Sequence, residues 1–295
     1  MIIGQNHATC LVPDDAILGE GPVWVPAERA IYWVDIKGRT ILRRSEASGE
    51  VERFTPPFQV ASLAPMVGGG FIAGTHRGFA KIDPRTGRYD PIVHPEPDRD
   101  GNRFNDGKLD RAGRFWAGTM DDAETAATGA LYRLDHDLEP VRVDDGYRVT
   151  NGPAFSRAGT CLYHTDSARQ VIFAFDLDEA GTVSGKRAFL RFGAGDGYPD
   201  GMTVDAEDCL WVAFWDGACI RRFAPDGSQL GEIALPVPRV TSCTFGGDDL
   251  ATLFITTARV GLDRVEHPLA GSLFAVRPGV AGIADTPFAG AFPAT

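Results

Sequence analysis

The stretch Asp205-Ala-Glu-Asp-Cys-Leu-Trp-Val-Ala213 joins a polar turn to a short apolar strand with a tryptophan at its centre. The same order recurs upstream, where Arg114-Phe-Trp-Ala-Gly118 follows the turn at 110–113 and Ile31-Tyr-Trp-Val-Asp35 follows the turn at 26–29. A polar turn followed by a short run of aromatic and β-branched residues is typical of a β-strand. The chain is therefore expected to repeat one β-rich unit along its length.

The aromatic residues of these strands recur about 38 to 48 residues apart, which is the spacing of β-propeller blades. Later strand-like runs within each unit, such as Ile220-Arg-Arg-Phe223, indicate four short strands per unit. The central aromatics are expected to pack between blades rather than to bind a ligand. They are Trp33, Phe71, Trp116, Tyr163, Trp211 and Phe254.

Six such units fill the chain, and we predict one all-β domain over residues 1–295: a six-bladed β-propeller with four-stranded antiparallel blades. A β-sandwich also contains short strands at close spacing, but the sustained aromatic phase favours the propeller. A strand around Ala8 to Val12 is expected to complete the last blade and so to remove a free sheet edge.

The composition limits the class of partner. A net charge of −11 and a pI near 5.0 argue against nucleic acid and anionic membranes, which need clustered Lys and Arg. The first twelve residues lack a secretory pattern, and no apolar stretch approaches a membrane span. The five cysteines form no CxxC motif, which indicates reduced thiols. We expect a cytoplasmic protein, monomeric or weakly homo-oligomeric, with neither nucleic acid nor membrane as partner.

Four units carry an oxygen-bearing side chain followed by glycine, about 10 to 13 residues before the aromatic strand. Positions at the same phase of successive blades lie at the same radius and height, so these side chains are expected to converge on the propeller axis. Glycine allows the close backbone approach that such a position needs. Each dipeptide alone would pass for a hairpin turn. The four are Glu20-Gly21, Asp106-Gly107, Asn151-Gly152 and Asp200-Gly201.

Converging carboxylates repel one another unless a cation lies between them. Glu20, Asn151 and Asp200 offer only oxygen atoms, which suits a hard divalent ion such as Ca²⁺ or Mg²⁺. Three protein ligands leave positions open for water and substrate, as in catalytic metal sites. Asp106, which follows Asn105, fits a turn as well as it fits a ligand.

Beyond this pattern, a series of short motifs runs through nearly the whole chain. They are Leu18-Gly-Glu-Gly-Pro-Val-Trp24, Trp33-Val-Asp-Ile36, Arg103-Phe-Asn-Asp-Gly-Lys108, Trp116-Ala-Gly-Thr-Met120, Thr150-Asn-Gly-Pro153, Tyr198-Pro-Asp-Gly-Met202, Leu210-Trp-Val-Ala213, Thr241-Ser-Cys-Thr-Phe-Gly-Gly247 and Thr256-Thr-Ala-Arg259. In these motifs, in their order and in their spacing, the chain resembles the gluconolactonase/regucalcin (senescence marker protein) family of sugar lactonases.

The resemblance implies a six-bladed propeller with one divalent metal near its axis. By position, Glu20, Asn151 and Asp200 match the family's metal ligands, while Arg103 and Asn105 match the residues that hold the oxygens of the lactone. Ca²⁺ is the first expectation for the metal, and Zn²⁺, Mn²⁺, Mg²⁺ and Fe²⁺ are alternatives. The implied partner is a small-molecule sugar lactone.

The chain departs from the family shortly after the Gly-Thr-Met motif, where relatives usually carry a glutamate. Ala123 stands at this place, flanked by Asp122 and Glu124, which are candidate substrate-binding residues. The resemblance places the loop from Asp121 to Thr128 over the pocket, so this departure is expected to affect the choice of substrate.

The predicted function is a metal-dependent hydrolase that opens an aldonolactone to the aldonic acid, with Asp200 as general base. One alternative is a propeller phosphotriesterase or aryl-lactonase, whose sites often recruit histidine. The histidines here share no phase, and His164 is expected to be a strand residue with a local hydrogen bond. The other alternative is a non-catalytic Ca²⁺-binding propeller, against which the presence of Arg103 and Asn105 argues.

Overall fold

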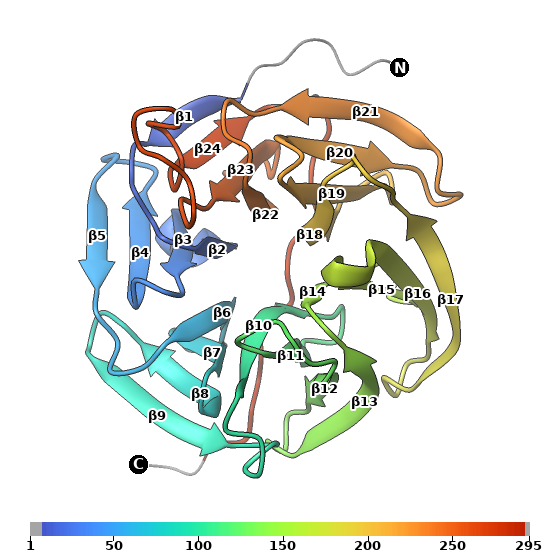
Figure 1. Cartoon of the computed structure of the whole chain (residues 1–295). Coiled ribbons are helices and arrows are strands. Elements are labelled where there is room, and N and C mark those ends of the chain that lie inside the picture. The colour runs from blue at the N-terminus through green and yellow to red at the C-terminus, as the bar shows by residue number, and fades with distance from the viewer. Residues whose placement is uncertain (1–7, 293–295) are drawn as a thin grey trace.

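A computed structural model describes residues 8–292 of the chain. Its strands form six four-stranded antiparallel sheets arranged around one axis (Figure 1). The predicted all-β, six-bladed propeller is therefore confirmed. Two single-turn 3₁₀ helices, Pro26–Glu28 and Ser167–Arg169, interrupt the strands. Within residues 8–292, no helix is long and apolar enough to cross a membrane.

Each blade is a meander in which the first strand lies nearest the axis and the last lies at the rim (Figure 1). Blade 1 consists of β2 (Gly19–Val25), β3 (Ala30–Asp35), β4 (Thr40–Ser45) and β5 (Val51–Phe54). Blade 2 consists of β6 (Val60–Pro65), β7 (Phe71–Thr75), β8 (Gly78–Asp83) and β9 (Arg88–Val93). Blade 3 consists of β10 (Asn102–Leu109), β11 (Phe115–Asp121), β12 (Gly129–Leu134) and β13 (Pro140–Tyr147). Blade 4 consists of β14 (Thr150–Phe155), β15 (Cys161–Asp166), β16 (Val171–Leu177) and β17 (Val183–Arg191). Blade 5 consists of β18 (Tyr198–Val204), β19 (Leu210–Trp215), β20 (Cys219–Phe223) and β21 (Gln229–Ala234). Blade 6 consists of β22 (Val240–Gly246), β23 (Thr252–Thr257), β24 (Leu273–Val276) and, at the rim, β1 (Thr9–Val12).

The two ends of the chain meet in blade 6. β1 pairs antiparallel with β24, with Cys10 opposite Phe274, and supplies the outer strand of the sheet. The N-terminal strand predicted around Ala8 to Val12 is thereby confirmed. Joining both ends in one blade closes the ring and covers the outer edge of β24, which would otherwise be unpaired.

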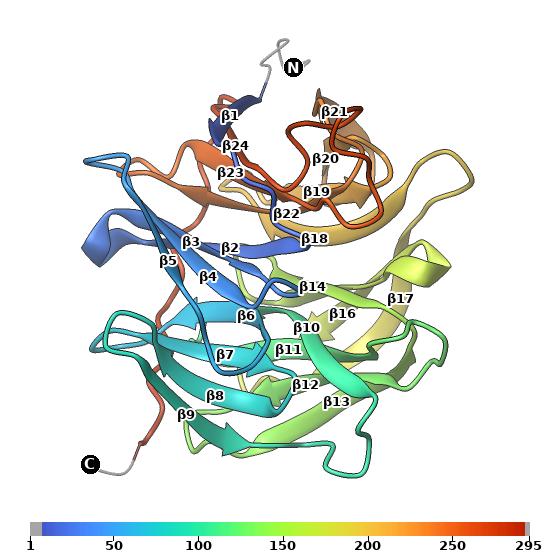
Figure 2. The same cartoon turned by 60° about the vertical axis from the view of Figure 1, so that its left-hand side comes forward.

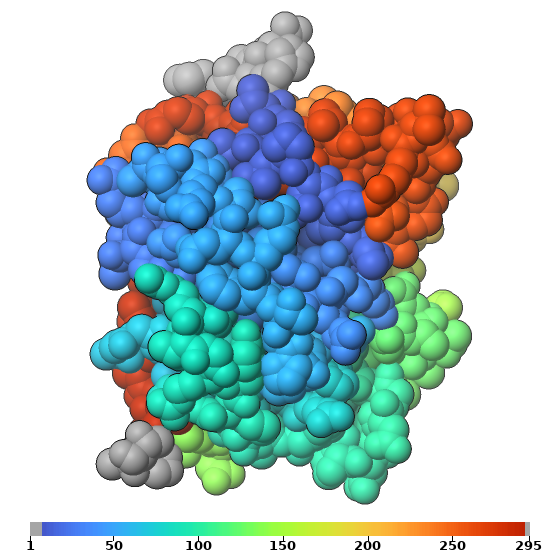
Figure 3. Space-filling model, turned by 90° about the vertical axis from the view of Figure 1, so that its left-hand side faces the viewer, coloured from blue at the N-terminus to red at the C-terminus, as the bar shows by residue number. Residues whose placement is uncertain are grey.

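Aromatic residues at the predicted phase pack within and between the blades. Trp33, Trp116 and Trp211 are at most 1% exposed, which confirms that they pack in the core. The Tyr32 and Phe71 rings meet edge to face across blades 1 and 2, with their centroids 4.8 Å apart. The neighbouring surfaces of these blades lie against each other in Figure 3. Such contacts hold the blades in fixed positions around the axis.

In each of two blades, a buried aspartate in the turn before the aromatic strand bonds to other parts of the same blade. In blade 5, the Asp205 carboxylate accepts hydrogen bonds from the backbone N–H groups of Glu207 (2.9 Å) and Cys209 (3.0 Å). Its other oxygen accepts from Trp211 Nε1 and Arg222 Nε, both at 2.8 Å. The turn, the tryptophan and the next strand are therefore joined through one carboxylate, which explains why turn and aromatic recur together in the sequence.

Blade 3 repeats this arrangement. Asp110 accepts hydrogen bonds from the backbone N–H of Ala112, from Arg114 Nε at 2.6 Å and from Trp116 Nε1 at 2.9 Å. In blade 4 a hydroxyl takes the place of the carboxylate, since Ser156 Oγ accepts from the next two backbone N–H groups after the turn.

A β-bulge interrupts the pairing of every innermost strand with its neighbour. In β2 the bulge lies between Glu20 and Val23, in β14 between Asn151 and Ala154, and in β18 it begins after Pro199. A bulge bends the strand locally and redirects its side chains. The repeated bulge therefore turns polar side chains of different blades toward the axis at one height.

The segment after β24 crosses the propeller face at which the innermost strands end (Figure 2). Gly282 N–H donates to Leu250 O (2.8 Å) in blade 6, and Phe288 pairs with Pro65 and Val67 in blade 2 through backbone hydrogen bonds of 2.9 Å. This segment after β24, called the C-terminal strap below, covers this end of the axis, while the other end stays open.

Removing the Asp205 carboxylate is expected to destabilise blade 5 strongly. In Asp205→Ala, the Trp211 indole N–H loses its partner and the buried guanidinium of Arg222 keeps only the exposed Glu207, so we expect a loss toward the lower end of the about 3–5 kcal/mol for a broken buried ion pair. Urea unfolding followed by tryptophan fluorescence measures the loss. The matched control is Asp226→Ala in an exposed turn of the same blade, where the carboxylate bonds only Ser228, and it should have a smaller effect. Equal unfolding free energies for the two variants would contradict this role.

Candidate functional site

A cavity of about 540 Å³ opens where the innermost strands begin. Six of the predicted site residues line it, and they come from four different blades. They are Glu20 on β2, Arg103 and Asn105 on β10, Glu124 in the loop after β11, Asn151 on β14 and Asp200 on β18. The structure thus brings together residues that are up to 180 positions apart in the sequence.

Two buried carboxylates lie on this wall, and within residues 8–292 neither forms an ion pair with a lysine or an arginine. Glu20 and Asp200 are each 5% exposed. Glu20 Oε2 accepts the Gly21 N–H at 3.0 Å, and Asp200 Oδ1 has no hydrogen-bond partner among the described residues. Burial, followed by the nearby Asp106 carboxylate, raises the pKa of Glu20 to about 8. Burial and the negative charge of Glu20 raise the pKa of Asp200 well above its usual range.

The Asn151 amide is held so that its oxygen faces the same space. Its Nδ2 donates to Ser167 Oγ at 2.9 Å, and that hydroxyl donates to Pro199 O at 2.6 Å. Asn151 Oδ1 accepts from Asn105 Nδ2 at 3.0 Å, and Asn105 Oδ1 accepts from Arg103 Nη1 at 2.7 Å. These hydrogen bonds connect Arg103 and Asn105, the expected substrate-binding residues, with Asn151, an expected metal ligand.

Asp106 is not on the cavity wall, although Asp106-Gly107 occupies the same position in its blade as the dipeptides that begin with Glu20, Asn151 and Asp200. It lines a small space deeper in the axis together with Gly21, Ser242 and Lys108. The bulge in β10 explains this, because Asn105 and Asp106 together lie opposite a single residue of β11 and only Asn105 reaches the cavity. Asp106 Oδ2 has no partner among the described residues, and burial raises its pKa to about 6.

These residues fit a hard divalent cation. Glu20, Asn151 and Asp200 present oxygen atoms, and two of the three are carboxylates whose pKa values are raised by burial and by neighbouring negative charge, which a bound cation would offset. In the part of the chain that the structure describes, no three His, Cys, Asp or Glu side chains are grouped closely enough to hold a metal ion by themselves. A cation in this cavity therefore needs a ligand of another kind, and the Asn151 amide oxygen is the one in place.

The loop after β11 lies beside the cavity and is tied to blade 1. Asp122 does not line the cavity; its Oδ1 accepts from Lys37 Nζ at 2.5 Å and from Arg103 Nε. Burial opposes ionisation, but the hydrogen bonds from Lys37 and Arg103 lower the pKa of Asp122 below its usual value. Asp122 thus contacts the expected substrate-binding arginine, while Glu124 reaches the cavity itself.

The sequence did not single out the other polar and aromatic residues of the cavity. These residues lie in turns or at strand ends on the open face, where neither phase nor motif marks them. They are Lys37, Arg148, Ser167, Tyr198, Trp215 and Arg239. Only Tyr198 had a sequence signal, because it begins the stretch that contains Asp200.

The histidine expectation is confirmed only in part. His164 lies in β15 as expected and is fully buried, with its ring packed edge to face on Tyr147 at 4.6 Å. Neither ring nitrogen has a hydrogen-bond partner among the described residues, so the expected local hydrogen bond is wrong. Burial lowers the pKa of His164 to about 3, which keeps the ring neutral.

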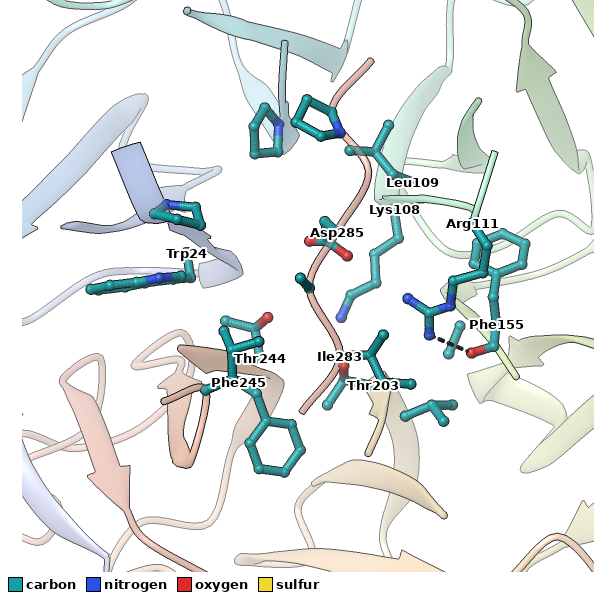
Figure 4. A pocket seen from close by; sticks show the side chains of 17 residues that line it. Trp24, Lys108, Leu109, Arg111, Phe155, Thr203, Thr244, Phe245, Ile283 and Asp285 are labelled. Carbon is teal, nitrogen blue, oxygen red and sulfur yellow. Dashed lines mark hydrogen bonds between the residues drawn. The ribbon is translucent and has the colours of Figure 1, made fainter. Parts of the chain in front are cut away.

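The opposite end of the axis has a different chemistry. A smaller pocket of about 90 Å³ lies there, and Figure 4 shows the C-terminal strap crossing it with Lys108 and Asp285 pointing inward. Lys108 Nζ donates to the backbone carbonyls of Met202 (2.7 Å) and Cys243 (3.3 Å). The strap and this bonded lysine leave the open end as the place for a substrate.

A model of the family described as SMP-30/gluconolactonase/LRE-like region matches residues 18–259. The chain belongs to this family. The match begins just before Glu20 and ends just after β23, so it contains all six blades' innermost strands and every residue of the cavity except Val260. The resemblance inferred from the motifs is thereby confirmed.

Members of the SMP-30/gluconolactonase family match over almost the full chain. The 6-deoxy-6-sulfogluconolactonase of Pseudomonas putida is 35% identical over 95% of this chain and 98% of its own length. Regucalcin of Gallus gallus is also 35% identical, with the same coverage. A crystal structure of a calcium-binding protein, regucalcin, from Agrobacterium tumefaciens superposes with a TM-score of 0.91 at 27% identity, covering 98% of both chains.

Without a bound cation, the protein should lose stability as the pH rises. Because the folded-state pKa of Glu20 is about 8 and its ordinary value is 4.5, the folded protein holds a proton that the unfolded chain releases between these values. The free energy of unfolding therefore falls across this pH range. Melting temperatures in chelator from pH 5 to 8.5 test this, and added divalent cation should raise them most near pH 8.

The matched control is Glu20→Gln, which has no carboxylate to ionise. Its melting temperature in chelator should depend less on pH than that of the unchanged protein. Identical pH profiles for the two proteins would show that Glu20 does not carry the effect.

Proposed function

We propose that this protein is a metal-dependent hydrolase that opens a sugar lactone, of the aldonolactone type, to the corresponding aldonic acid. The observation that carries the proposal is the pair of buried, uncompensated carboxylates, Glu20 and Asp200, beside the Asn151 amide in an open cavity. Membership of the SMP-30/gluconolactonase family supports the reaction class, and two relatives over 30% identical are named as a lactonase and as regucalcin.

Glu20, Asn151 and Asp200 would hold one divalent cation. When bound, the cation supplies Lewis acidity to the lactone carbonyl and lowers the pKa of water in the site. We propose Ca²⁺ first, because the ligands are oxygen atoms only and the Agrobacterium relative is described as calcium-binding. Zn²⁺, Mn²⁺, Mg²⁺ and Fe²⁺ are alternatives that oxygen ligands also accept.

Asp200 is the proposed general base. Its free Oδ1 can take a proton from water, whose oxygen then forms a bond to the carbonyl carbon of the lactone. The bond from that carbon to the ring oxygen breaks, and the ring oxygen receives the proton to become a hydroxyl. No further co-reactant is needed, and the product is an aldonic acid.

Arg103 and Asn105 are proposed to bind the lactone oxygens. Arg103 is held by Asp122 through Nε and by Asn105 through Nη1, so its guanidinium is fixed before substrate enters. A fixed donor stabilises developing negative charge more effectively than a mobile one. Asp122 is then a positioning residue for Arg103, while Glu124, on the cavity wall, remains a candidate for direct contact with a sugar hydroxyl.

The location of the protein is also a proposal. All five cysteines are free thiols, and four of them lie in strands. Free thiols are typical of a reducing compartment, which supports a cytoplasmic site of action. A monomer or weak homo-oligomer remains our expectation for the assembly.

The reaction is tested by a pH-indicator assay on chelated protein that is resupplied with single metals. Pentono- and hexonolactones are compared with aryl esters and organophosphates. We expect hydrolysis of the aldonolactones only, dependent on added metal. Hydrolysis of organophosphates alone would favour the phosphotriesterase alternative, and tight metal binding without any hydrolysis would favour a non-catalytic calcium-binding propeller.

Asp200→Asn should lower kcat far more than it lowers metal occupancy. The amide keeps an oxygen ligand but cannot accept the proton, and loss of a general base costs about 10²- to 10⁴-fold in rate. Metal content by mass spectrometry and turnover on one lactone are measured together. Asn151→Asp, which keeps the oxygen and adds charge, is the control that alters the ligand set without removing the base. Unchanged turnover in Asp200→Asn would remove Asp200 from this role.

A further inference from the structure

We propose that the lactone bound in this cavity carries a negatively charged group at the end remote from its carbonyl, and that Arg148 and Arg239 bind that group. The inference rests on the proposed lactonase function and narrows its substrate class. Both arginines line the cavity, and neither belongs to the set of residues expected to hold the metal or the lactone ring.

Arg239 lies immediately before β22 in the cavity wall, with only 20% of its side chain exposed. Its guanidinium carbon lies 4.7 Å from the centre of the Trp215 ring, which also lines the cavity. Nε donates to Asp216 Oδ1 at 3.0 Å and Nη1 donates to Val260 O. Nη2 has no partner among the described residues. Arg239 is therefore a fixed group with one donor edge unused.

Arg148 lies between β13 and β14, three residues before Asn151. Its Nε donates to the backbone carbonyl of Glu124 at 2.8 Å, so it is anchored to the loop after β11. Neither terminal nitrogen bonds to another described residue, and no carboxylate forms an ion pair with it. Its positive charge is left for a ligand.

The charge of the cavity differs from that of the protein as a whole. The chain has a net charge of −11, yet four cationic residues line this one cavity: Lys37, Arg103, Arg148 and Arg239. The carboxylates that line it are those of Glu20, Glu124 and Asp200. A bound divalent cation would neutralise Glu20 and Asp200. Lys37 and Arg103 share the Asp122 carboxylate and Arg239 pairs with Asp216, so the positive charge left over for a ligand lies mainly on the Arg148 side of the cavity. Such a charge attracts an anionic substrate and raises its rate of capture.

An aromatic surface lies between the two arginines. Tyr198 and Trp215 are paired across β18 and β19, and Tyr198 is 43% exposed although it lines the cavity. The strands β14, β18 and β22 are neighbours around the ring, so this surface separates Arg148 from Arg239. Aromatic side chains offer a large apolar surface beside a polar group, so the exposed Tyr198 ring can pack against the C–H groups of a sugar while Arg239 occupies the Trp215 ring.

The spacing along β18 suits a hexose. Tyr198 precedes Asp200 by two residues, which is at most about 6 to 7 Å along the strand because the bulge in β18 begins after Pro199. A lactone whose carbonyl lies near Asp200 would therefore place its far end at the aromatic surface and the arginines. The part of the cavity wall that carries Lys37 and Arg103 is less suited to an anion, because both cations already share the Asp122 carboxylate behind it.

The two arginines could instead bind the carboxylate that every lactone yields on opening. Arginines that bind the product carboxylate would affect the turnover of neutral and anionic lactones equally. Arginines that bind a charged group at the end remote from the carbonyl would favour the anionic lactone over the neutral one. The decisive readout is therefore the ratio of kcat/KM for an anionic lactone to that for its neutral parent, in the unchanged protein and in variants.

The test compares gluconolactone with lactones that carry a phosphate, a sulfonate or a carboxylate at the sixth carbon, on the metal-loaded enzyme. We expect kcat/KM to be at least about tenfold higher for one of the anionic lactones, and to fall with added salt. Arg239→Gln and Arg148→Gln should each lower that value by about tenfold or more, mainly through KM, as expected for loss of a charged hydrogen bond. The effect on gluconolactone should be clearly smaller.

The matched control is Arg88→Gln, an exposed arginine paired with Asp90 on the outer strand β9, which should leave the ratio unchanged. Arg239→Lys is a second variant that keeps the charge and loses the planar fork, and thermal melts verify that each variant is folded. Equal kcat/KM for neutral and anionic lactones, or an equal loss on both in the arginine variants, would overturn the inference and leave the proposed lactonase intact.

A binding measurement separates this inference from the failure of the proposed function. Titration calorimetry compares gluconate with its 6-phosphate, 6-sulfonate and 6-carboxylate analogues on the same protein. One outcome is that no lactone is hydrolysed, but one of the three analogues with a second anionic group binds at least tenfold more tightly than gluconate. If Arg239→Gln then removes this difference in affinity, the anion-binding site is supported even though the proposed reaction is not. Equal binding of all four acids overturns it.

Discussion

The buried carboxylates of Glu20 and Asp200 are the constraint around which this end of the propeller is built. Each is held within a cavity by an innermost strand, and each has a pKa raised by burial and by neighbouring negative charge. In a small or flexible fold, such groups would move apart or turn to solvent. Here the strands that carry them are fixed by the ring of blades, so the repulsion has to be met by a cation or by protons.

Two features give the ring its rigidity. Aromatic side chains pack at the blade interfaces, and buried aspartates tie turn, tryptophan and neighbouring strand together within blades 3 and 5. Blade 6 joins the first and last strands of the chain, so that opening the ring requires the loss of a whole sheet pairing. These contacts lie away from the cavity, and they allow the strained arrangement of acids to persist at the axis.

The two ends of the axis differ because the innermost strands run in the same direction. Their starts bring charged and polar side chains from several blades into an open cavity, whereas their ends are covered by the C-terminal strap and occupied by Lys108. Around the open end, the loop after β11 connects blades: Asp122 joins Lys37 to Arg103, and Arg148 holds the backbone of Glu124. The residue change at Ala123 therefore lies in a loop whose position is set by ion pairs across blades.

The sequence by itself determined the blades and most of the cavity floor. Aromatic strands at a regular period predicted the propeller. Oxygen–glycine pairs at one phase predicted that Glu20, Asp106, Asn151 and Asp200 converge on the axis, because a repeated fold converts sequence phase into radius and height. Only the tertiary structure decided that Asn105 faces the cavity while Asp106 lies beneath it, since a bulge exchanges which residue points inward. It also revealed Arg148, Trp215 and Arg239, and placed Asp122 against Arg103 instead of on the wall. These residues belong to turns of different blades and meet only across the closed ring, so no local pattern in the chain marks them.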